Sequence, residues 1–470
     1  MYMGHFGAMD IHAPSPVGYA PRLGLFSGTM LVVGGIIGSG IFLSPSVVAQ
    51  RVGTAPLTLA AWGIGAVVAV IGGFVYGELG ARRPQAGGTY VYLREAFGTL
   101  PAFLYGWALF LIMATGAIAA VAMTGASYLA TLLGVAPEHA RAIAIALIVI
   151  LTALNVLGVR IGATTGNVLT VLKLSAIVIL VVAVVVMSPS HPVPVATVAA
   201  APLLPPPRWS ATGVAMGAAL VPVLFSFGGW QQTNAVAEEL RDPARTLPRA
   251  LLLGVLIVAA TYLLVNLAYL RALGVAGLAA SSAPAADTMF VYLGPAGRTL
   301  ITCGIVASTV GFLGMVILMS ARVYQAMAAD GLFFQRMAAL HPQTRTPVVA
   351  LVAQGAVALV LLLTGTYGQL LDYVVFADWI FFGATAATLF VLRKRDAQQG
   401  AQGGTSSVVR APGHPFTTLL FIAAAIYVVV GSILSNPGNA ARGAGLLALG
   451  VPVYLYWNAR RPATRPPATP

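Results

Sequence analysis

Apolar runs of about 20 residues recur along the whole chain, separated by short polar segments. A run of this length spans the hydrocarbon core of a bilayer when it forms an α-helix. The pattern predicts an all-α membrane protein with 12 transmembrane helices, over residues 24–49, 57–80, 101–132, 141–159, 164–187, 212–236, 248–270, 297–324, 347–364, 369–392, 416–434 and 441–458.

The twelve runs define one transmembrane domain over residues 23–460, since no polar stretch between them is long enough for a soluble domain. Residues 1–22 precede it as a tail with no signal-peptide pattern. Residues 461–470 follow it as a Pro-rich tail that we expect to be disordered.

Glycine clusters interrupt the first and the sixth of these runs, at Gly34–Gly40 and at Gly228-Gly229. Glycine costs about 1 kcal/mol against alanine in a helix, so both clusters predict a break. Interrupted spans in corresponding positions of two halves indicate the substrate site of a transporter. The offset of five spans reverses the membrane orientation, which predicts two inverted five-helix repeats, at about 23–190 and 208–395, followed by two further helices at about 414–459.

The two breaks offer complementary backbone chemistry. Amides freed at Gly38–Phe42 would stand at the positive end of the following half-helix, where they suit a carboxylate. Carbonyls freed at Phe225–Trp230 would suit an ammonium group. Together the breaks fit a zwitterion, with Phe225 able to close over it. The competing interpretation is a helix-packing face of small residues with ordinary aromatic packing.

Composition and charge agree with a membrane setting. Hydrophobic residues make up 59% of the chain and charged residues 8%, against about 25% charged in a soluble domain. The formal net charge is +13, and with a cytoplasmic N-terminus 18 Lys and Arg residues fall in inner segments, while six fall in outer loops: Arg51, Arg141, Arg208, Arg271, Arg298 and Arg442. This is the positive-inside pattern, so we expect both termini in the cytoplasm and no nucleic-acid partner.

The chain lacks the residues that several functional classes require. The spans hold no convergent His, Cys, Asp and Glu set, so we expect neither an enzyme nor a metal or cofactor site. Lysine occurs only at Lys173 and Lys394, and neither follows glycine, which excludes a phosphate-binding loop. Cys303 is the only cysteine, so no internal disulfide exists. A channel is the remaining alternative, but two broken spans favour a carrier with alternating access.

A few charged residues fall within or at the ends of the spans. Lys173 lies about nine residues inside the fifth span, where an ammonium group needs a partner unless it snorkels to the interface. Asp378 lies in the tenth span, where it could bind a proton, help a basic substrate or line a watery vestibule. Acidic residues near the predicted inner face should form ion pairs with neighbouring arginines, the acids being Glu78, Glu238, Glu239 and Asp242 and the partners Arg82, Arg241, Arg245 and Arg322.

Five segments in this order resemble the L-type amino acid transporters of the amino acid–polyamine–organocation superfamily: VGGIIGSGIF (Val33–Phe42), Glu78–Tyr90, FSFGGWQQTNAVAEELRDPARTLP (Phe225–Pro248), Ser320–Gly331 and His341–Pro347. The resemblance covers nearly the whole chain and depends on the combination of segments. It implies the inverted-repeat, leucine-transporter-like fold with discontinuous helices 1 and 6.

The resemblance also implies site residues. The backbone around Ser39, Gly40 and Ile41 would bind the substrate carboxylate, and the region of Ile36, Phe225 and Ser226 the amine. Lys173 would take the place of a sodium ion beside the first helix, and Phe225 would act as a gate. The complete predicted substrate site is Ile36, Ile37, Gly38, Ser39, Gly40, Ile41, Phe225, Ser226, Phe227, Gly228 and Trp379, with Trp230 as a second gate residue.

These implications define an expected function. We expect a sodium-independent carrier of neutral L-amino acids in a bacterial inner membrane, in contact with lipid. The alternatives are a basic amino acid or polyamine antiporter, or a proton-coupled symporter, of the same superfamily. Animal members carry a cysteine in the outer loop after the third span, which joins an accessory subunit. This chain has none at residues 134–141, so we expect no disulfide-linked partner.

Overall fold

The computed structural model describes residue 19 and residues 21–193, 209–364, 367–400, 409–435 and 437–459, so most of both predicted tails lies outside the described residues. Helices dominate them: α1 (Leu25–Ile36), α2 (Gly40–Val52), α3 (Ala55–Arg82), α4 (Thr89–Phe97), α5 (Thr99–Ala108), η1 (Leu109–Met113), α6 (Ala114–Leu133), η2 (Pro137–His139), α7 (Ala140–Val156), α8 (Val159–Val186), α9 (Trp209–Ser226), η3 (Trp230–Glu239), α10 (Pro243–Ala280), α11 (Pro284–Ala329), η4 (Gln335–Ala338), α12 (Val348–Thr364), α13 (Tyr367–Gly400), α14 (Phe416–Ser435) and α15 (Pro437–Ala459).

Helical character is confirmed at each predicted apolar run. Within the described residues, eight helices are long and apolar enough to cross a membrane, or nine if α1 and α2 form one bent span. The protein is therefore a multi-pass, all-helical membrane protein. The count of twelve spans and the two inverted repeats remain predictions.

The first predicted break is confirmed. Helix α1 ends at Ile36 and α2 begins at Gly40, and the two are bent by 42°. Between them Ile37 leaves helical geometry, with ψ at 88°. The peptide groups on both sides of this turn are thereby released from the α-helical ladder.

The second break differs from the expected span over residues 212–236. Helix α9 ends at Ser226, and the chain continues as the 3-10 helix η3 (Trp230–Glu239), not as a second α-helical half. Gly229 makes the turn with φ at 108°, a value that glycine adopts without strain. The run Gln231–Asn234 is polar, so this segment depends on polar partners inside the protein, not on lipid contact.

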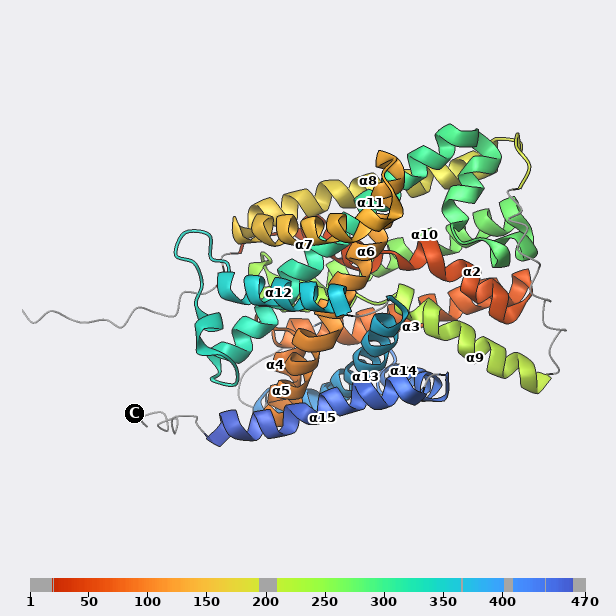
Figure 1. Cartoon of the computed structure of the whole chain (residues 1–470). Coiled ribbons are helices and arrows are strands. Elements are labelled where there is room, and N and C mark those ends of the chain that lie inside the picture. The colour runs from red at the N-terminus through yellow and green to blue at the C-terminus, as the bar shows by residue number, and fades with distance from the viewer. Residues whose placement is uncertain are drawn as a thin grey trace, which may run out of the picture.

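The broken elements are enclosed by long helices. Helix α10 packs along α3, α11 packs along α8, and α1 packs against both α10 and α8. Figure 1 shows α7 and α8 on one side of the bundle and α14 and α15 on the opposite side. Large apolar side chains such as Phe416 and Leu434 are 79% and 78% exposed, as expected of surfaces that face lipid.

Ion pairs gather at one end of the bundle, here called the basic end and defined by Arg82, Arg83, Arg94, Arg322 and Arg393. Its centre is the fully buried Glu78 of α3, whose carboxylate accepts hydrogen bonds from Arg82 (2.8 Å), Arg393 (2.6 Å) and the amide of Ala411 (2.7 Å). The predicted pairing of acids with arginines is thus confirmed at Glu78, and equally for Arg322 with Glu239 and Arg245 with Asp242.

The pair Arg322–Glu239 links α11 to the last residue of η3. The Nε of Arg322 lies 2.8 Å from Glu239, and the two side chains are 0% and 2% exposed. The ring of Tyr19 covers the guanidinium at 5.4 Å, and burial raises the pKa of the Tyr19 phenol. The backbone of Leu23 pairs with that of Leu240 next to Glu239. The segment before α1 therefore packs against the end of η3.

We predict that Arg322→Ala destabilises the protein strongly, because the carboxylate of Glu239 would stay buried without its partner. Breaking a buried pair costs about 3–5 kcal/mol. The measurement is the melting temperature of the purified protein in detergent. Arg245→Ala is the control, since its pair with Asp242 is exposed and spans 3.8 Å, and such pairs contribute about 0–1 kcal/mol. Equal melting temperatures for the two variants would contradict the structural role of the buried pair.

Candidate functional site

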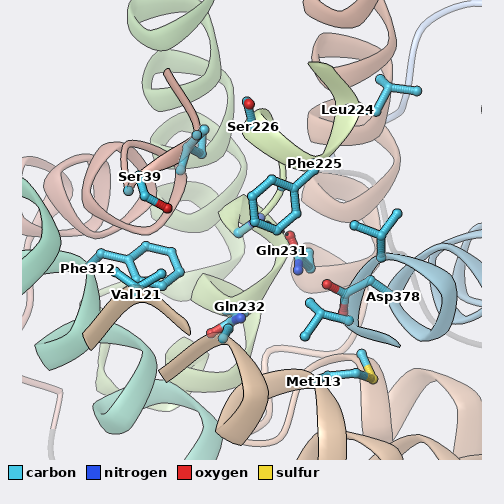
Figure 2. Close-up of a pocket in the computed structure, with 18 of the residues that line it drawn as sticks. Ser39, Met113, Val121, Leu224, Phe225, Ser226, Gln231, Gln232, Phe312 and Asp378 are labelled. Atoms are coloured by element: carbon cyan, nitrogen blue, oxygen red, sulfur yellow. Dashed lines mark hydrogen bonds between the residues drawn. The ribbon is translucent and has the colours of Figure 1, made fainter. Parts of the chain in front are cut away.

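One cavity lies where the two breaks meet, with about 690 Å3 of empty space. The breaks supply one wall, and α6, α11 and α13 supply the others. Its lining residues are Ile36, Gly38, Ser39, Gly40, Met113, Ala117, Val121, Leu224, Phe225, Ser226, Gly228, Gly229, Gln231, Gln232, Phe312, Val374, Val375, Asp378, Trp379 and Phe382. Figure 2 shows the ring of Phe225 between Ser39 and Phe312 on one side and Asp378 on the other.

The start of α2 presents hydrogen-bond donors to this cavity. The first amides of a helix have no intrahelical acceptor, so those of Gly40 and Ile41 are available to a ligand. The Oγ of Ser39 is buried and has no hydrogen-bond partner among the described residues. A Cβ on Gly40 would come within 2.6 Å of the Oγ of Ser226, so only glycine allows α2 to approach α9 this closely. The local chemistry fits an anionic group such as a carboxylate.

The two breaks are joined by hydrogen bonds and by direct contact. The single phenol proton of Tyr262 on α10 is shared between the carbonyls of Ile36, at 3.3 Å, and Ser226, at 3.1 Å. The carbonyl of Ile36 also accepts from the amide of Gly38 at 2.9 Å, so the carbonyl of Ser226 is the one that keeps a lone pair for a bound cation. A Cβ on Gly229 would come within 2.0 Å of the carbonyl oxygen of Gly35. Tyr262 was missed by the sequence analysis, although a buried phenol usually finds a hydrogen-bond partner.

Lys173 of α8 is fully buried behind the first break and does not snorkel. Its Nζ donates to the carbonyl of Gly34 at 3.1 Å and to that of Ile37 at 2.5 Å. Ser308 of α11 donates to Ile37 and Gly38 from the same side, at 3.0 and 3.3 Å. Together they supply positive charge and donors to the carbonyls that the end of α1 releases.

The predicted site residues fall into two groups. Seven of them line the cavity together with Trp379: Ile36, Gly38, Ser39, Gly40, Phe225, Ser226 and Gly228. The side chains of Ile37, Ile41 and Phe227 are buried outside this lining, with Phe227 packed on Trp62 and Tyr262.

Trp230, the second predicted gate residue, also lies outside the main cavity. Its ring makes an edge contact with Tyr76, with the centroids 4.9 Å apart, and it packs against Phe382 and Phe421. It borders a smaller apolar cavity of about 210 Å3, which shares Leu224, Gly228, Trp379 and Phe382 with the first. The local arrangement is that of an aromatic cluster beside the cavity.

Several lining residues were not among the predicted site residues, namely Met113, Val121, Phe312, Gln231 and Gln232. Gln231 and Gln232 directly follow the second break, and two amides within an apolar span were an available signal. Met113 ends η1, a π-helical turn inside the third span, and such turns often mark functional sites. The sequence held no comparable signal for Val121 or Phe312, which reach the cavity through the rotation of their helices.

Comparisons with known proteins find similarity to amino acid transporters over most of the chain. The family model described as "Amino acid permease" matches residues 23–453. The serine/threonine exchanger SteT of Bacillus subtilis is 29% identical over 94% of this chain and 98% of its own length. The rat large neutral amino acids transporter small subunit 2 is 30% identical over 93% of this chain and 81% of its own length, and the mouse b(0,+)-type amino acid transporter 1 is 28% identical over 88% and 83%.

We predict that Gly229→Ala disrupts the junction of the two breaks. Alanine at φ 108° carries backbone strain of about 1–3 kcal/mol, and its Cβ would collide with the carbonyl of Gly35. A fall in the melting temperature of the purified protein measures this effect. Gly63→Ala in α3 is the control, because its Cβ would meet nothing within 4 Å and should stabilise the helix by up to about 1 kcal/mol. If both variants melt at or above the temperature of the original protein, the close contact between the breaks is wrong.

Proposed function

Because this chain belongs to the amino acid permease family, and so is a membrane transporter of amino acids and not an enzyme, we propose that it exchanges small or medium neutral L-amino acids across the membrane without sodium. The cycle would be alternating access, in which the bundle rocks around a substrate held at the two breaks. The named relatives include a serine/threonine exchanger and a large neutral amino acid transporter subunit, which supports neutral substrates and exchange.

The observation that carries this proposal is the pairing of opposite backbone groups in one cavity. Donors at the start of α2, including the unpartnered Oγ of Ser39, suit the substrate carboxylate. The carbonyl of Ser226 lies across the junction with one lone pair free beside the bond from Tyr262, and it suits the ammonium group. Such a site binds the part that all amino acids share and leaves the side chain free to vary. Phe225, which lies over the middle of the cavity, would close it.

Sodium independence is supported by the side chains that bind the carbonyls of the first break. Lys173 and Ser308 already occupy the carbonyls of Gly34, Ile37 and Gly38. A sodium ion needs several such oxygens at once, and the ammonium group of Lys173 would supply a positive charge at the same place. We therefore assign Lys173 the support of the first broken helix in place of an ion.

The membrane arrangement is part of the same proposal. We propose twelve spans in a single domain at residues 23–460, built from two inverted repeats of five helices with α14 and α15 as the additional pair. The basic end would face the cytoplasm, as would both termini, in agreement with the positive-inside rule. The bacterial exchanger among the relatives supports a bacterial inner membrane. With Cys303 as the sole cysteine, lying on α11, we propose a carrier without a disulfide-linked subunit.

The test is exchange in liposomes that contain the purified protein. Vesicles loaded with one unlabelled neutral amino acid should take up a labelled one faster than empty vesicles, equally in sodium and in choline buffer and without a pH gradient. Ser39→Phe should abolish this uptake because the ring fills the space beside the freed amides. Ser127→Phe, which places the same ring on an exposed position of α6, should transport normally. Uptake that requires sodium or a proton gradient, or uptake by Ser39→Phe at the original rate, would refute the proposal.

Lys173→Ala tests the assignment of the ammonium group. We expect uptake to fall at least tenfold, because the carbonyls at the end of α1 lose both charge and donors, while insertion and monodispersity in detergent are retained. Lys394→Ala is the matched control, since this is the other lysine of the chain and its side chain is exposed. If Lys173→Ala exchanges amino acids as fast as Lys394→Ala, the lysine has no part in the cycle.

A further inference from the structure

The carboxylate of Asp378 lies in the cavity and has no hydrogen-bond partner in the part of the chain that the structure describes. It projects from α13 on the side of Phe225 that is remote from Ser39, toward Gln231 (Figure 2). Among the described residues no hydrogen bond or ion pair reaches it, whereas the buried acid Glu78 accepts from two arginines and one amide. Asp378 is therefore a hydrogen-bond acceptor of high capacity that the fold leaves unused.

The polar neighbours of Asp378 in the lining are Gln231 and Gln232, whose side-chain NH2 groups are donors but make no hydrogen bond to it among the described residues. Gln231 uses its Oε1 to accept from the amide of Gly229 at 2.9 Å, which fixes that side chain to the break. The Oε1 of Gln232 is buried and also has no partner among the described residues. The remaining neighbours in this part of the lining, Met113, Val375 and Phe382, are apolar. Two unsatisfied acceptors thus face a cavity whose walls are otherwise mostly apolar.

When a ligand expels water from a site, each buried acceptor that is left without a hydrogen bond weakens binding. This cost is avoided if the ligand itself brings a donor. The substrate carboxylate and ammonium group are matched to the backbone at the breaks, so the group that reaches toward Asp378 is the substrate side chain. A site built to hydrogen-bond a substrate rejects an analogue without the donor far more strongly than an apolar pocket rejects an extra hydroxyl. The carboxylate of Asp378 is thus suited to distinguishing substrates with a side-chain donor from substrates without one.

We propose that Asp378 determines specificity by accepting a hydrogen bond from the substrate side chain, so that the carrier selects amino acids whose side chains end in a donor. The preferred class comprises hydroxyl and amide side chains, and an ammonium group would satisfy the same acceptor. Gln232 is the second acceptor of this subsite. The inference rests on the proposed function, since it presumes that the backbone ends of an amino acid bind at the two breaks.

The experiment compares pairs of substrates that differ in the donor and hardly in shape. Threonine against valine, glutamine against methionine and lysine against norleucine compete with a labelled substrate for exchange in liposomes. We expect the donor-bearing member of the threonine and glutamine pairs to bind at least tenfold better. Asp378→Leu should bring each ratio close to one while valine uptake is retained or improved, which shows that the variant is folded.

Asp378→Asn separates the two kinds of donor. It keeps an acceptor oxygen but loses the charge, so the threonine and glutamine preferences should persist in reduced form while any preference for lysine disappears. Asp242→Asn, which alters an exposed aspartate at the start of α10, should leave all ratios unchanged.

The outcomes distinguish this inference from the proposed function. Ratios near one in the original protein, or ratios that survive Asp378→Leu, would overturn the role of Asp378 while neutral exchange stands. A strong preference for lysine that Asp378→Asn removes would support the acceptor and refute the restriction to neutral substrates. A protein that exchanges no amino acid at all would refute the proposed function and this inference together.

Discussion

Every carbonyl and amide within a bilayer must find a partner inside the protein, because lipid offers none. This chain interrupts its helices at two breaks that lie together, after α1 and after α9, and so releases backbone groups inside the bundle. Three side chains from three other helices satisfy them: Lys173, Ser308 and Tyr262. All three donate to carbonyls, and the amides at the start of α2 remain available. These donors satisfy carbonyls at the breaks, and the groups left over include the amides that an anion can use.

The same elements that hold the breaks also reach the basic end. Helix α11 carries Ser308 at the first break and Arg322 in the buried ion pair, and fourteen residues of helix separate them by about 21 Å. The 3-10 helix η3 begins next to Gly229 and ends at Glu239, the partner of Arg322. The site and the basic end are thus connected by two parallel paths that meet at one salt bridge. The pair Arg322–Glu239 therefore fixes the end of η3 to α11.

Sequence reasoning succeeded where a residue type is costly in a membrane. The glycine clusters and the acids near Arg82 and Arg322 could be interpreted from their positions along the chain, and the place of Lys173 beside the first helix from the family resemblance. The structure places each at a break or in an ion pair. It failed where the outcome depends on helix rotation or on backbone geometry that no single residue dictates. The 3-10 form of η3, the reach of Tyr262 to two carbonyls and the presence of Phe312 in the lining all depend on how distant segments pack.

The two neighbouring glycines of the second break illustrate why sequence shows only part of a site. Both were interpreted as helix breakers, yet they have different roles. Gly229 has a positive φ and touches the backbone of Gly35, so it joins the two broken spans. Gly228 has ordinary backbone geometry and lines the cavity, and the nearest atoms to an added Cβ are the carbonyls of Phe225 and Leu224 in the preceding turn. A Cβ there would stand 3.2 Å from the carbonyl oxygen of Phe225, so this carbonyl would have to move by a few tenths of an ångström. The first glycine of the pair therefore borders the cavity, whereas the second makes the junction of the two breaks.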